Sequence, residues 1–299
     1  MHLRALMYFD ELVRSRSMRA AAEKLNVAPT AISRQIENLE EHFGTPLVER
    51  SSRGVTLTAA GELLAARAGK TLRELTLVHQ LIDDLKGLER GEVTVFANGA
   101  ALNLLAPVLS RFTLRYPKIH FHVEITSANQ AVEALQTAEA DVALMLFAPQ
   151  PSQVNVLVSK DIAYDVIVAA DHPLAGAKIA SLEELTGLAL ALPAKSFAAR
   201  QAIDEMFSKA GIEIDPVFTV SSLELLRELV LDKAAITLLP ALSVSREIRI
   251  GQMVAVPLSG SNAVSTAIQL CTAPDRELSF AASSFVAFME ETMRNGDAK

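Results

Sequence analysis

Two adjacent side chains, Arg34 and Gln35, are of the types that form paired hydrogen bonds with base edges in the major groove of DNA. Arginine pairs in this way with guanine and glutamine with adenine, so these positions could distinguish one base pair from another. Thr30 and Ser33 lie close to them and carry hydroxyl groups that can reach phosphates or bases. Such a set can contact DNA only if a helix presents it on one exposed face.

The sequence around these residues predicts two short helices joined by a tight turn. Ser17 is a suitable N-cap for the first helix, and residues 26–28 form the connection. Pro29 suits the first turn of the second helix, where its missing N–H costs no hydrogen bond. Gly44 is a typical residue just past a helix end. The apolar positions of the second helix are Ile32, Ile36 and Leu39. This arrangement is the helix-turn-helix pattern.

The stretch that follows these helices decides between two interpretations. An ordinary helical hairpin with a solvated polar face would have the same pattern up to Gly44. Residues 47–58, however, read as two short strands around a tip of serine, arginine and glycine. Such a hairpin would form a wing that carries Arg50 and Arg53 toward the DNA backbone. We therefore expect a winged helix-turn-helix domain in residues 1–58.

Four runs in this region resemble the DNA-binding domain of LysR-type transcriptional regulators. They read AAEKL, SRQIENLE, GTPLVER and GVTLTAAG, in the order and spacing of that family. The family often has glutamine at the position of Pro29 and an aromatic residue at that of Val48. We assign DNA binding to Ser17, Pro29, Thr30, Ser33, Arg34, Gln35, Arg50 and Arg53.

The charge of the chain is divided unevenly between its two parts. The whole chain has a formal net charge of −7. Residues 1–90 contain 13 lysines and arginines against 12 aspartates and glutamates, whereas residues 91–299 contain 15 against 23. Contact with DNA would therefore come from a local basic patch in the first part of the chain.

Composition also argues against several classes of protein. The chain is 50% hydrophobic, but no apolar run approaches the roughly 18–20 residues that a membrane span needs. Asp10 and Glu11 lie where a signal peptide would need an apolar core. The single cysteine, Cys271, cannot form an internal disulfide. We therefore expect a cytoplasmic protein that does not contact a membrane.

No pattern in the sequence predicts catalysis, a metal site or a cofactor. The G-x-S-x-G, P-loop and H-E-x-x-H motifs are absent, and Cys271 lies in an apolar run. His120 and His122 would share one side of a strand, but no third ligand lies nearby in the sequence. An exposed strand face is the better interpretation of these histidines, and we do not expect an enzyme.

After the wing, apolar and small residues recur at spacings of four and three. Their positions are Leu57, Gly61, Leu64, Ala68, Thr71, Leu75, Val78, Ile82 and Leu85. This heptad pattern predicts one long helix in residues 59–90. Such a helix would either pair with the same helix of a second chain or be buried in its own domain. The family resemblance implies the first of these, a dimerising linker.

From residue 91 strands alternate with helices, which predicts an α/β fold with a mostly parallel sheet. The resemblance implies an effector-binding domain, residues 91–299, with two lobes like those of type 2 periplasmic binding proteins. We place the two chain crossings between lobes near 160–161 and 265–267. Lobe I then comprises about 91–160 and 267–299, and lobe II about 161–266. In lobe II, residues 162–169 should form one strand, and Lys233 and Ala235 replace glycines usual in the family.

Four groups of short polar residues follow the expected strands at the starts of helices. In open α/β sheets, ligands bind beyond the carboxyl ends of the strands, where helix N–H groups can hold a small anion. The candidate effector-binding residues are Asn98, Gly99, Ala100, Ser127, Asn129, Gln130, Ser196, Phe197, Arg200, Ser221 and Ser222. Each could instead be an ordinary helix cap, and only together do they favour a ligand site. An inward Arg200 would add a carboxylate contact, whereas neutral donors alone suit an alcohol or amide nearly as well.

These observations predict a transcriptional regulator that binds double-stranded operator DNA and responds to a small-molecule effector, for which we expect a small organic anion. The resemblance also implies a homodimer or homotetramer, with RNA polymerase as a further candidate partner. The alternative is a solute receptor or enzyme that uses its N-terminal helices only to form oligomers. In that protein Arg34, Arg50 and Arg53 would be replaceable.

Overall fold

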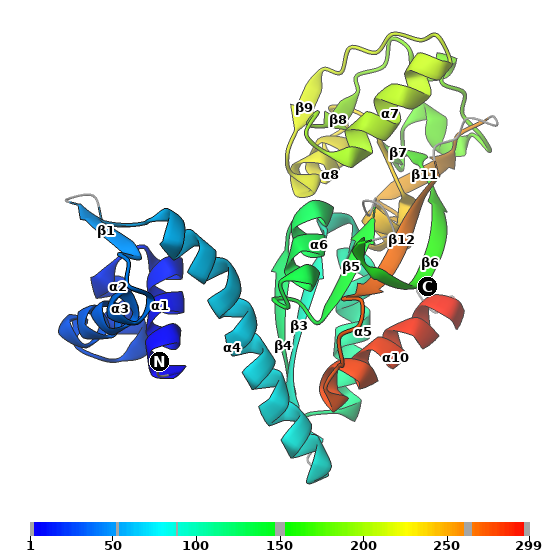
Figure 1. Cartoon of the computed structure of the whole chain (residues 1–299). Helices are drawn as coiled ribbons and strands as arrows, with labels where there is room; N and C mark the ends of the chain where they lie inside the picture. The colour runs from blue at the N-terminus through cyan, green and yellow to red at the C-terminus, as the bar shows by residue number, and fades with distance from the viewer. Residues whose placement is uncertain (1–2, 52–53, 88, 147–152, 260–264, 296–299) are drawn as a thin grey trace. The chain divides into compact units, whose positions relative to one another are not determined.

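The computed structural model describes residues 3–51, 54–87, 89–146, 153–259 and 265–295. The chain divides into two compact units, residues 1–87 with 137–139 and residues 88–136 with 140–299. The first unit is mostly helical, and the second combines sheets with helices (Figure 1). Among the helices described, none has both the length and the apolar character that crossing a membrane requires.

The first unit has the predicted order of helices and strands. Its elements are α1 (Leu3–Ser15), α2 (Met18–Leu25), α3 (Pro29–Phe43), β1 (Val48–Ser51), β2 (Gly54–Leu57) and α4 (Ala59–Leu85). The Ser17 hydroxyl accepts the N–H of Ala20 at 3.4 Å and caps α2. Pro29 is the first residue of α3, and Gly44, with a φ of 67°, ends it. The predicted caps and the antiparallel wing, β1 with β2, are confirmed.

The core of this unit is formed by the apolar faces of α1 and α3. Phe9 and Leu12 of α1 and Ile32 and Ile36 of α3 are at most 1% exposed. The helix-turn-helix therefore packs against α1.

Helix α4 uses its heptad positions in two different ways. In its first half, Leu64 and Ala68 pack against the core of α1 and α3. In its second half, large apolar side chains remain exposed on one face. They are Leu75 at 37%, Val78 at 48%, Ile82 at 45% and Leu85 at 88% exposure. The interpretation of a helix buried in its own domain therefore applies to the first half, and pairing with a second chain stays a prediction for the second half.

The second unit contains a five-stranded sheet, and we call this sheet with the helices that pack on it lobe I. Its elements are β3 (Gly91–Ala97), η1 (Gly99–Ala101), α5 (Leu102–Arg115), β4 (Ile119–Ile125), α6 (Ala128–Gln136), β5 (Val142–Leu146), β6 (Asn155–Ala163), β12 (Ser265–Thr272) and α10 (Phe280–Asn295). The strand order is β4-β3-β5-β12-β6. Strand β3 runs parallel to β4 and β5, whereas β12 is antiparallel to both its neighbours.

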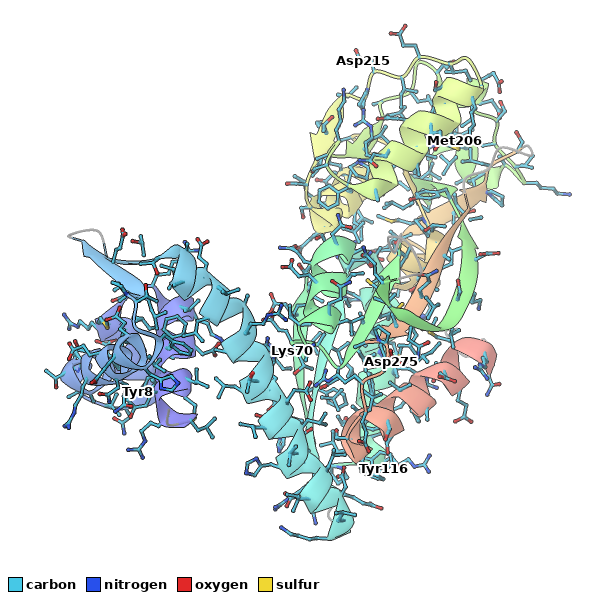
Figure 2. All side chains as sticks on the ribbon, viewed as in Figure 1. Tyr8, Lys70, Tyr116, Met206, Asp215 and Asp275 are labelled. Carbon is cyan, nitrogen blue, oxygen red and sulfur yellow. The ribbon has the colours of Figure 1, made fainter. Side chains whose placement is uncertain are left out.

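Helices cover both faces of this sheet, α5 and α10 on one and α6 on the other (Figure 1). The first face has an aromatic core in which the Phe112 ring lies within 5.7 Å of four other ring centroids. One of these belongs to Tyr116, which is labelled in Figure 2. Edge-to-face packing of this kind adds to the apolar burial that holds the two helices on the sheet.

The remaining part of the second unit, lobe II, differs in two ways from the sequence prediction. Its elements are β7 (Asp165–Ala169), η3 (Pro173–Gly176), η4 (Glu183–Leu185), β8 (Ala191–Pro193), α7 (Ala198–Lys209), β9 (Phe218–Val220), α8 (Leu223–Leu231), β10 (Thr237–Leu239), η5 (Ala241–Val244), α9 (Ser245–Arg249) and β11 (Met253–Pro257). The expected strand 162–169 is two strands, because β6 ends at Ala163 and β7 starts at Asp165. The mostly parallel sheet is also wrong here, since β7 is antiparallel to β10 and β11.

Strands β6 and β12 contain both positions at which we expect the chain to cross between lobes. Lys160 pairs with Ile268 and Asp161 with Ala267. The two segments are thus bonded to each other. A further link between the lobes is the Asn103 side chain, whose Nδ2 donates to the carbonyl oxygen of Leu242 at 3.1 Å.

Lys233 adopts the left-handed backbone that its place in the sequence suggests. Its φ is 59°, a conformation that costs a residue with a Cβ roughly 1–2 kcal/mol and glycine very little. The side chain forms an ion pair with Asp171, and both groups are well exposed. An exposed pair contributes little, so the strain is not fully offset.

Gly61 and Gly69, both buried in α4, provide a matched test of how this helix is seated. A Cβ on Gly61 would lie 2.0 Å from the backbone oxygen of Leu47, whereas one on Gly69 would meet only side-chain atoms, the nearest being Arg73 Nη1 at 3.0 Å. We expect Gly61→Ala to lower the free energy of unfolding by about 1–3 kcal/mol. Gly69→Ala should leave the free energy of unfolding unchanged or raise it by roughly 0.5–1 kcal/mol. Urea denaturation of both variants measures the difference, and equal effects would contradict this seating.

Candidate DNA interface and effector site

The polar face of α3 carries the side chains that the sequence predicts for base contacts. Pro29, Thr30 and Arg34 are exposed, and Ser33 and Gln35 are half-buried. Thr30 and Arg34 are one turn apart and share one face of the helix. The Ser33 hydroxyl donates to Glu37 Oε1 at 3.1 Å, so its contact with a phosphate or base would have to displace this bond.

The first turn of α3 lacks a side-chain cap. Ala28 is the N-cap residue and its methyl group accepts no hydrogen bond, in contrast to Ser17 at the start of α2. Pro29 has no N–H, and the Ala31 N–H donates to the Ala28 oxygen at 2.9 Å. The Thr30 N–H and the positive end of the helix dipole are therefore what this turn can offer a phosphate oxygen. The Ser17 hydroxyl is itself occupied as the cap of α2, as the sequence predicts.

The root of the wing is fixed by a residue that sequence reasoning missed, Glu40. Its Oε1 accepts the backbone N–H groups of Leu47 at 2.8 Å and Val48 at 3.2 Å. On the other side, the Thr58 N–H donates to the Leu47 oxygen at 3.1 Å. The Glu40 carboxylate on α3 therefore fixes the start of the first wing strand relative to this helix. A glutamate a few residues before the turn is the only sequence signal of this role.

The wing arginines can be placed only in part. Arg50 belongs to β1 and pairs with Val55 in the backbone register. Arg53 lies outside the described residues. The backbone N–H of Val55 donates to the carbonyl oxygen of Arg16 at 3.3 Å, which ties the wing to the end of α1.

A partly exposed carboxylate also links α1 to α2. Glu11 accepts a hydrogen bond from the Ser15 hydroxyl at 2.5 Å and forms an ion pair with Lys24 at 3.1 Å. Burial opposes its ionisation, but the Ser15 hydrogen bond and the Lys24 charge prevail and lower the pKa of Glu11. The pair joins α1 to α2, and since Lys24 is 62% exposed it contributes little to stability.

In lobe I the two candidate effector groups follow neighbouring parallel strands. Ala97 pairs with Ile125, so Asn98–Ala100 and Ser127–Gln130 come after adjacent strand ends. The Asn98 side chain is bonded to the backbone of Leu146, through Nδ2 at 2.8 Å and Oδ1 at 3.3 Å. Asn98 therefore braces the loop, and the backbone of Gly99 and Ala100 is the better candidate for ligand contact.

Ser127 and Gln130 form a capping box at the start of α6. Gln130 Oε1 accepts from the Ser127 hydroxyl at 2.9 Å, and the Gln130 N–H donates to the Ser127 oxygen at 3.3 Å. Asn129 is exposed. The capping interpretation thus accounts for Ser127 and Gln130, and a ligand would have to compete with these bonds.

In lobe II the two other groups also follow paired strand ends. Pro193 pairs with Val220, so Ser196–Phe197 and Ser221–Ser222 come after neighbouring strands. Phe197 is the N-cap residue of α7 and offers no side-chain hydrogen bond, whereas the Ser222 hydroxyl accepts the Leu225 N–H at 3.2 Å. Ser196, Phe197, Ser221 and Ser222 are all exposed.

Arg200 faces the interior of lobe II and is only 4% exposed. Its Nε donates to Asp204 at 2.6 Å, and its Nη1 donates to the Pro193 oxygen at 3.2 Å. The charge is thus balanced by Asp204, and the guanidinium holds the end of β8 in place. A carboxylate contact from Arg200 would require these bonds to break.

The described residues give no sign of metal or thiol chemistry. No group of three or more His, Cys, Asp or Glu among them could hold a metal ion. His120 and His122 are exposed on β4. Cys271 is fully buried in β12, and burial raises the pKa of its thiol to about 12. At neutral pH this thiol is not a nucleophile.

The chain matches two models of protein families. Residues 3–62 match "Bacterial regulatory helix-turn-helix protein, lysR family". Residues 86–294 match "LysR substrate binding domain". The first match ends near the start of α4, and the second begins directly after α4 ends.

Curated relatives of the chain are bacterial regulators. A RuBisCO operon transcriptional regulator of Allochromatium vinosum is 28% identical over 262 residues, which cover 86% of this chain and 85% of the relative. The uncharacterised HTH-type transcriptional regulator YybE of Bacillus subtilis is 30% identical over 216 residues, or 71% and 73% of the two chains.

Solved structures show the same fold. A full-length OxyR variant from Pseudomonas aeruginosa has a TM-score of 0.72 at 23% identity, covering 98% of this chain and 95% of that one. Full-length CbnR in complex with its target DNA also has a TM-score of 0.72, at 22% identity and with 98% and 100% covered.

Replacement of Glu40 tests the wing root. Glu40→Ala leaves the N–H groups of Leu47 and Val48 without their charged acceptor, and we expect the free energy of unfolding to fall by about 1.5–3 kcal/mol. Glu40→Gln keeps an acceptor oxygen and should lose less. The exposed neighbour is the control, since Glu41→Ala should change stability by less than about 0.5 kcal/mol. Thermal and urea unfolding measure the three variants, and a Glu40→Ala value equal to the Glu41→Ala value would exclude the anchoring role.

Proposed function

Since the chain belongs to the LysR family of transcriptional regulators, we propose that its α3 reads the major groove of an operator while its wing follows the adjacent backbone. The protein is a sequence-specific DNA-binding regulator with an effector-binding domain. Its relatives are regulators and not enzymes, so the receptor or enzyme alternative has no support.

One observation carries the proposed mode of DNA binding: the face of α3 with Thr30 and Arg34 is exposed, and the uncapped first turn lies at the same end of the helix. Phosphate binding by the Thr30 N–H at the positive end of the helix dipole would fix the position of the helix along the groove. Arg34 and Gln35 would then reach base edges, and Arg50 and Arg53 would contact phosphates beside the groove. The Glu40 contact joins α3 to the first strand of the wing.

The second half of α4 supports the proposal of a homodimer. Four large apolar side chains on one face are between 37% and 88% exposed, at the three- and four-residue spacing of a coiled-coil seam. Pairing with a second copy removes them from water and places two DNA-binding heads on one operator. We propose domain limits of 1–58, 59–90 and 91–299, with the lobe limits given above, and a tetramer as the higher assembly.

The loops of the two lobes support an effector with both an acceptor group and an apolar part. Free backbone donors at η1 and at the start of α7 suit an acidic or carbonyl group. Large apolar side chains are exposed beside these loops, namely Leu102, Ile125, Phe197 and Leu225. We propose a small organic anion with a hydrocarbon portion. Calorimetry with organic acids and the corresponding alcohols tests this, and equal affinity for both would exclude an anion-specific site.

Effector binding would change the populations of two lobe arrangements and so alter how α4 presents the heads. The site of action is the cytoplasm, where the operator and RNA polymerase are found. Contact with RNA polymerase is the further partnership that we propose.

Arg34 and Arg53 should have different effects on DNA binding. Arg34→Ala should weaken specific binding by about 1–3 kcal/mol and relax discrimination at one base pair. Arg53→Ala should weaken binding to all sequences and lower the salt slope by about one. Footprinting and salt titration of both variants provide the measurement. Unchanged operator affinity in Arg34→Ala would exclude α3 as the reading helix.

Leu75→Asp should disrupt the dimer, because it places a carboxylate in the proposed seam. Thr76→Asp adds the same charge on the opposite side of α4, and Thr76 is also exposed. Analytical ultracentrifugation of the full-length protein should show dissociation at concentrations at which the Thr76→Asp control remains associated. Equal behaviour of both variants would exclude the seam.

A further inference from the structure

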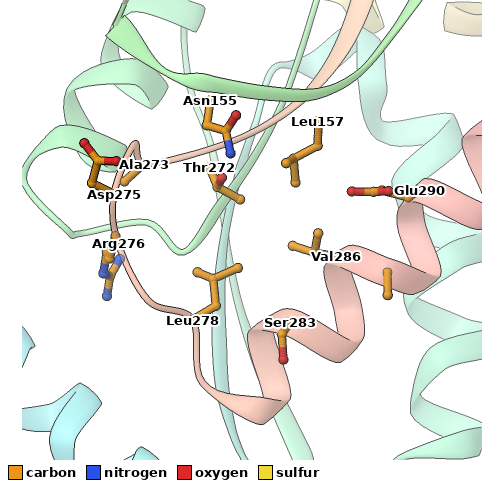
Figure 3. Close-up of a pocket in the computed structure, with 11 residues that line it drawn as sticks. Asn155, Leu157, Thr272, Ala273, Asp275, Arg276, Leu278, Ser283, Val286 and Glu290 are labelled. Atoms are coloured by element: carbon orange, nitrogen blue, oxygen red, sulfur yellow. The ribbon is translucent and has the colours of Figure 1, made fainter.

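A cavity of about 320 Å³ lies in lobe I between β6, the turn after β12 and the side of α10 (Figure 3). Residues of three segments line it, namely Asn155 and Leu157 of β6, five residues between Thr272 and Leu278, and Ser283, Val286, Ala287 and Glu290 of α10. These positions belong to neither the DNA interface nor the four effector groups. The cavity therefore has no role in the function described above.

A β-bulge directs one side chain into this cavity. In the β6–β12 ladder Leu270 pairs with Val158 and Cys271 pairs with Val156, so Leu157 is the extra residue. Val156 packs with the α6 side of the sheet, whereas Leu157 and Val158 both pack toward α5 and α10. The bulge thus interrupts the normal alternation and places Leu157 against the cavity (Figure 3).

The turn at the opposite side of the cavity is strained and tightly held. Asp275 has a φ of 55°, an unusual backbone conformation for a residue other than glycine. Next to it, Arg276 Nη1 donates to the Ala140 oxygen at 2.9 Å and Nη2 contacts Asp141 at 3.2 Å. Strain and bulges persist where the surroundings enforce them, and they gather at binding sites. Here both occur on the wall of one cavity.

The charges around the cavity leave it negative. Arg276 is only 12% exposed and is paired with Asp141, and Glu290 is paired with Arg294, so the net negative charge among the lining residues comes from Asp275. Glu290 is 25% exposed, and Arg294, itself 65% exposed, contacts only its Oε2 at 3.1 Å. In Figure 3 the Glu290 side chain extends from α10 toward the space between Leu157 and Val286.

We propose that this cavity is a second ligand site, which takes a small organic cation such as a primary ammonium ion with a short aliphatic chain. The hydrocarbon part lies on Leu157, Leu278 and Val286. The ammonium group donates to the Glu290 carboxylate, at the end of the apolar surface. A volume of about 320 Å³ admits such a molecule and excludes a macromolecular partner.

Three probes with the same four-carbon body test the charge preference: n-butylammonium, n-butanol and butanoate. Saturation-transfer NMR on the full-length protein reports weak binding of small molecules to a large assembly. We expect n-butylammonium to bind at least about 5-fold more tightly than the alcohol, because a charged hydrogen bond is stronger than a neutral one. Butanoate should bind less tightly than the alcohol.

Variants on α10 locate the bound probe. Glu290→Gln should weaken n-butylammonium binding about 5- to 10-fold, whereas Glu291→Gln, on an exposed neighbour, should leave it unchanged. Ala287 is exposed and lines the cavity, so Ala287→Phe can fill the space without disturbing the core. This variant should abolish binding of all three probes. Absence of n-butylammonium binding, or binding that neither Glu290→Gln nor Ala287→Phe reduces, would overturn the proposal.

Discussion

The backbone of Leu47 is the point on which the geometry of the DNA-binding unit depends. Its N–H is bound by Glu40 of α3, its oxygen accepts from Thr58 at the start of α4, and its oxygen lies where Gly61 has no Cβ. Three elements therefore meet on one buried backbone unit. Because buried backbone groups must be paired, a shift of any one element would leave a donor or acceptor unsatisfied. These bonds fix the wing relative to α3 for this reason.

Local signals predicted the helices of the first unit closely, since Ser17, Pro29 and Gly44 each act within one turn of their own position. The first three strands of lobe I, β3 to β5, were also predictable, because they alternate clearly with helices. Strand β6 and the antiparallel direction of β12 were not predicted. Lobe II was less predictable: β6 and β7 meet at Tyr164 without a turn residue between them, and nothing in the sequence separates the two strands. The direction of β10 and β11 depends on long-range pairing, which periodicity does not reveal.

Candidate site residues were predictable by type more than by role. Serine and glutamine before a helix satisfy the same N–H groups that a ligand would use, and in Ser127 and Ser222 the cap is what forms. Arg200 is of a type that binds carboxylates, but it forms an ion pair with Asp204, four residues later on the same helix. The contribution of Glu40 could not be foreseen, because it depends on how the chain returns past α3 after Gly44.

The two halves of α4 have a consequence for how such regulators can be recombined. The core of the DNA-binding unit includes Leu64, Ala68 and Leu72, so this unit does not end where the wing ends. A chimaera joined directly after Leu57 would give the head a foreign α4 whose side chains have not been fitted to Phe9 and Leu12. A junction after Leu72 keeps each hydrophobic surface with its own sequence. Domains of this architecture can therefore be exchanged only through a junction in the middle of α4, which is a continuous helix.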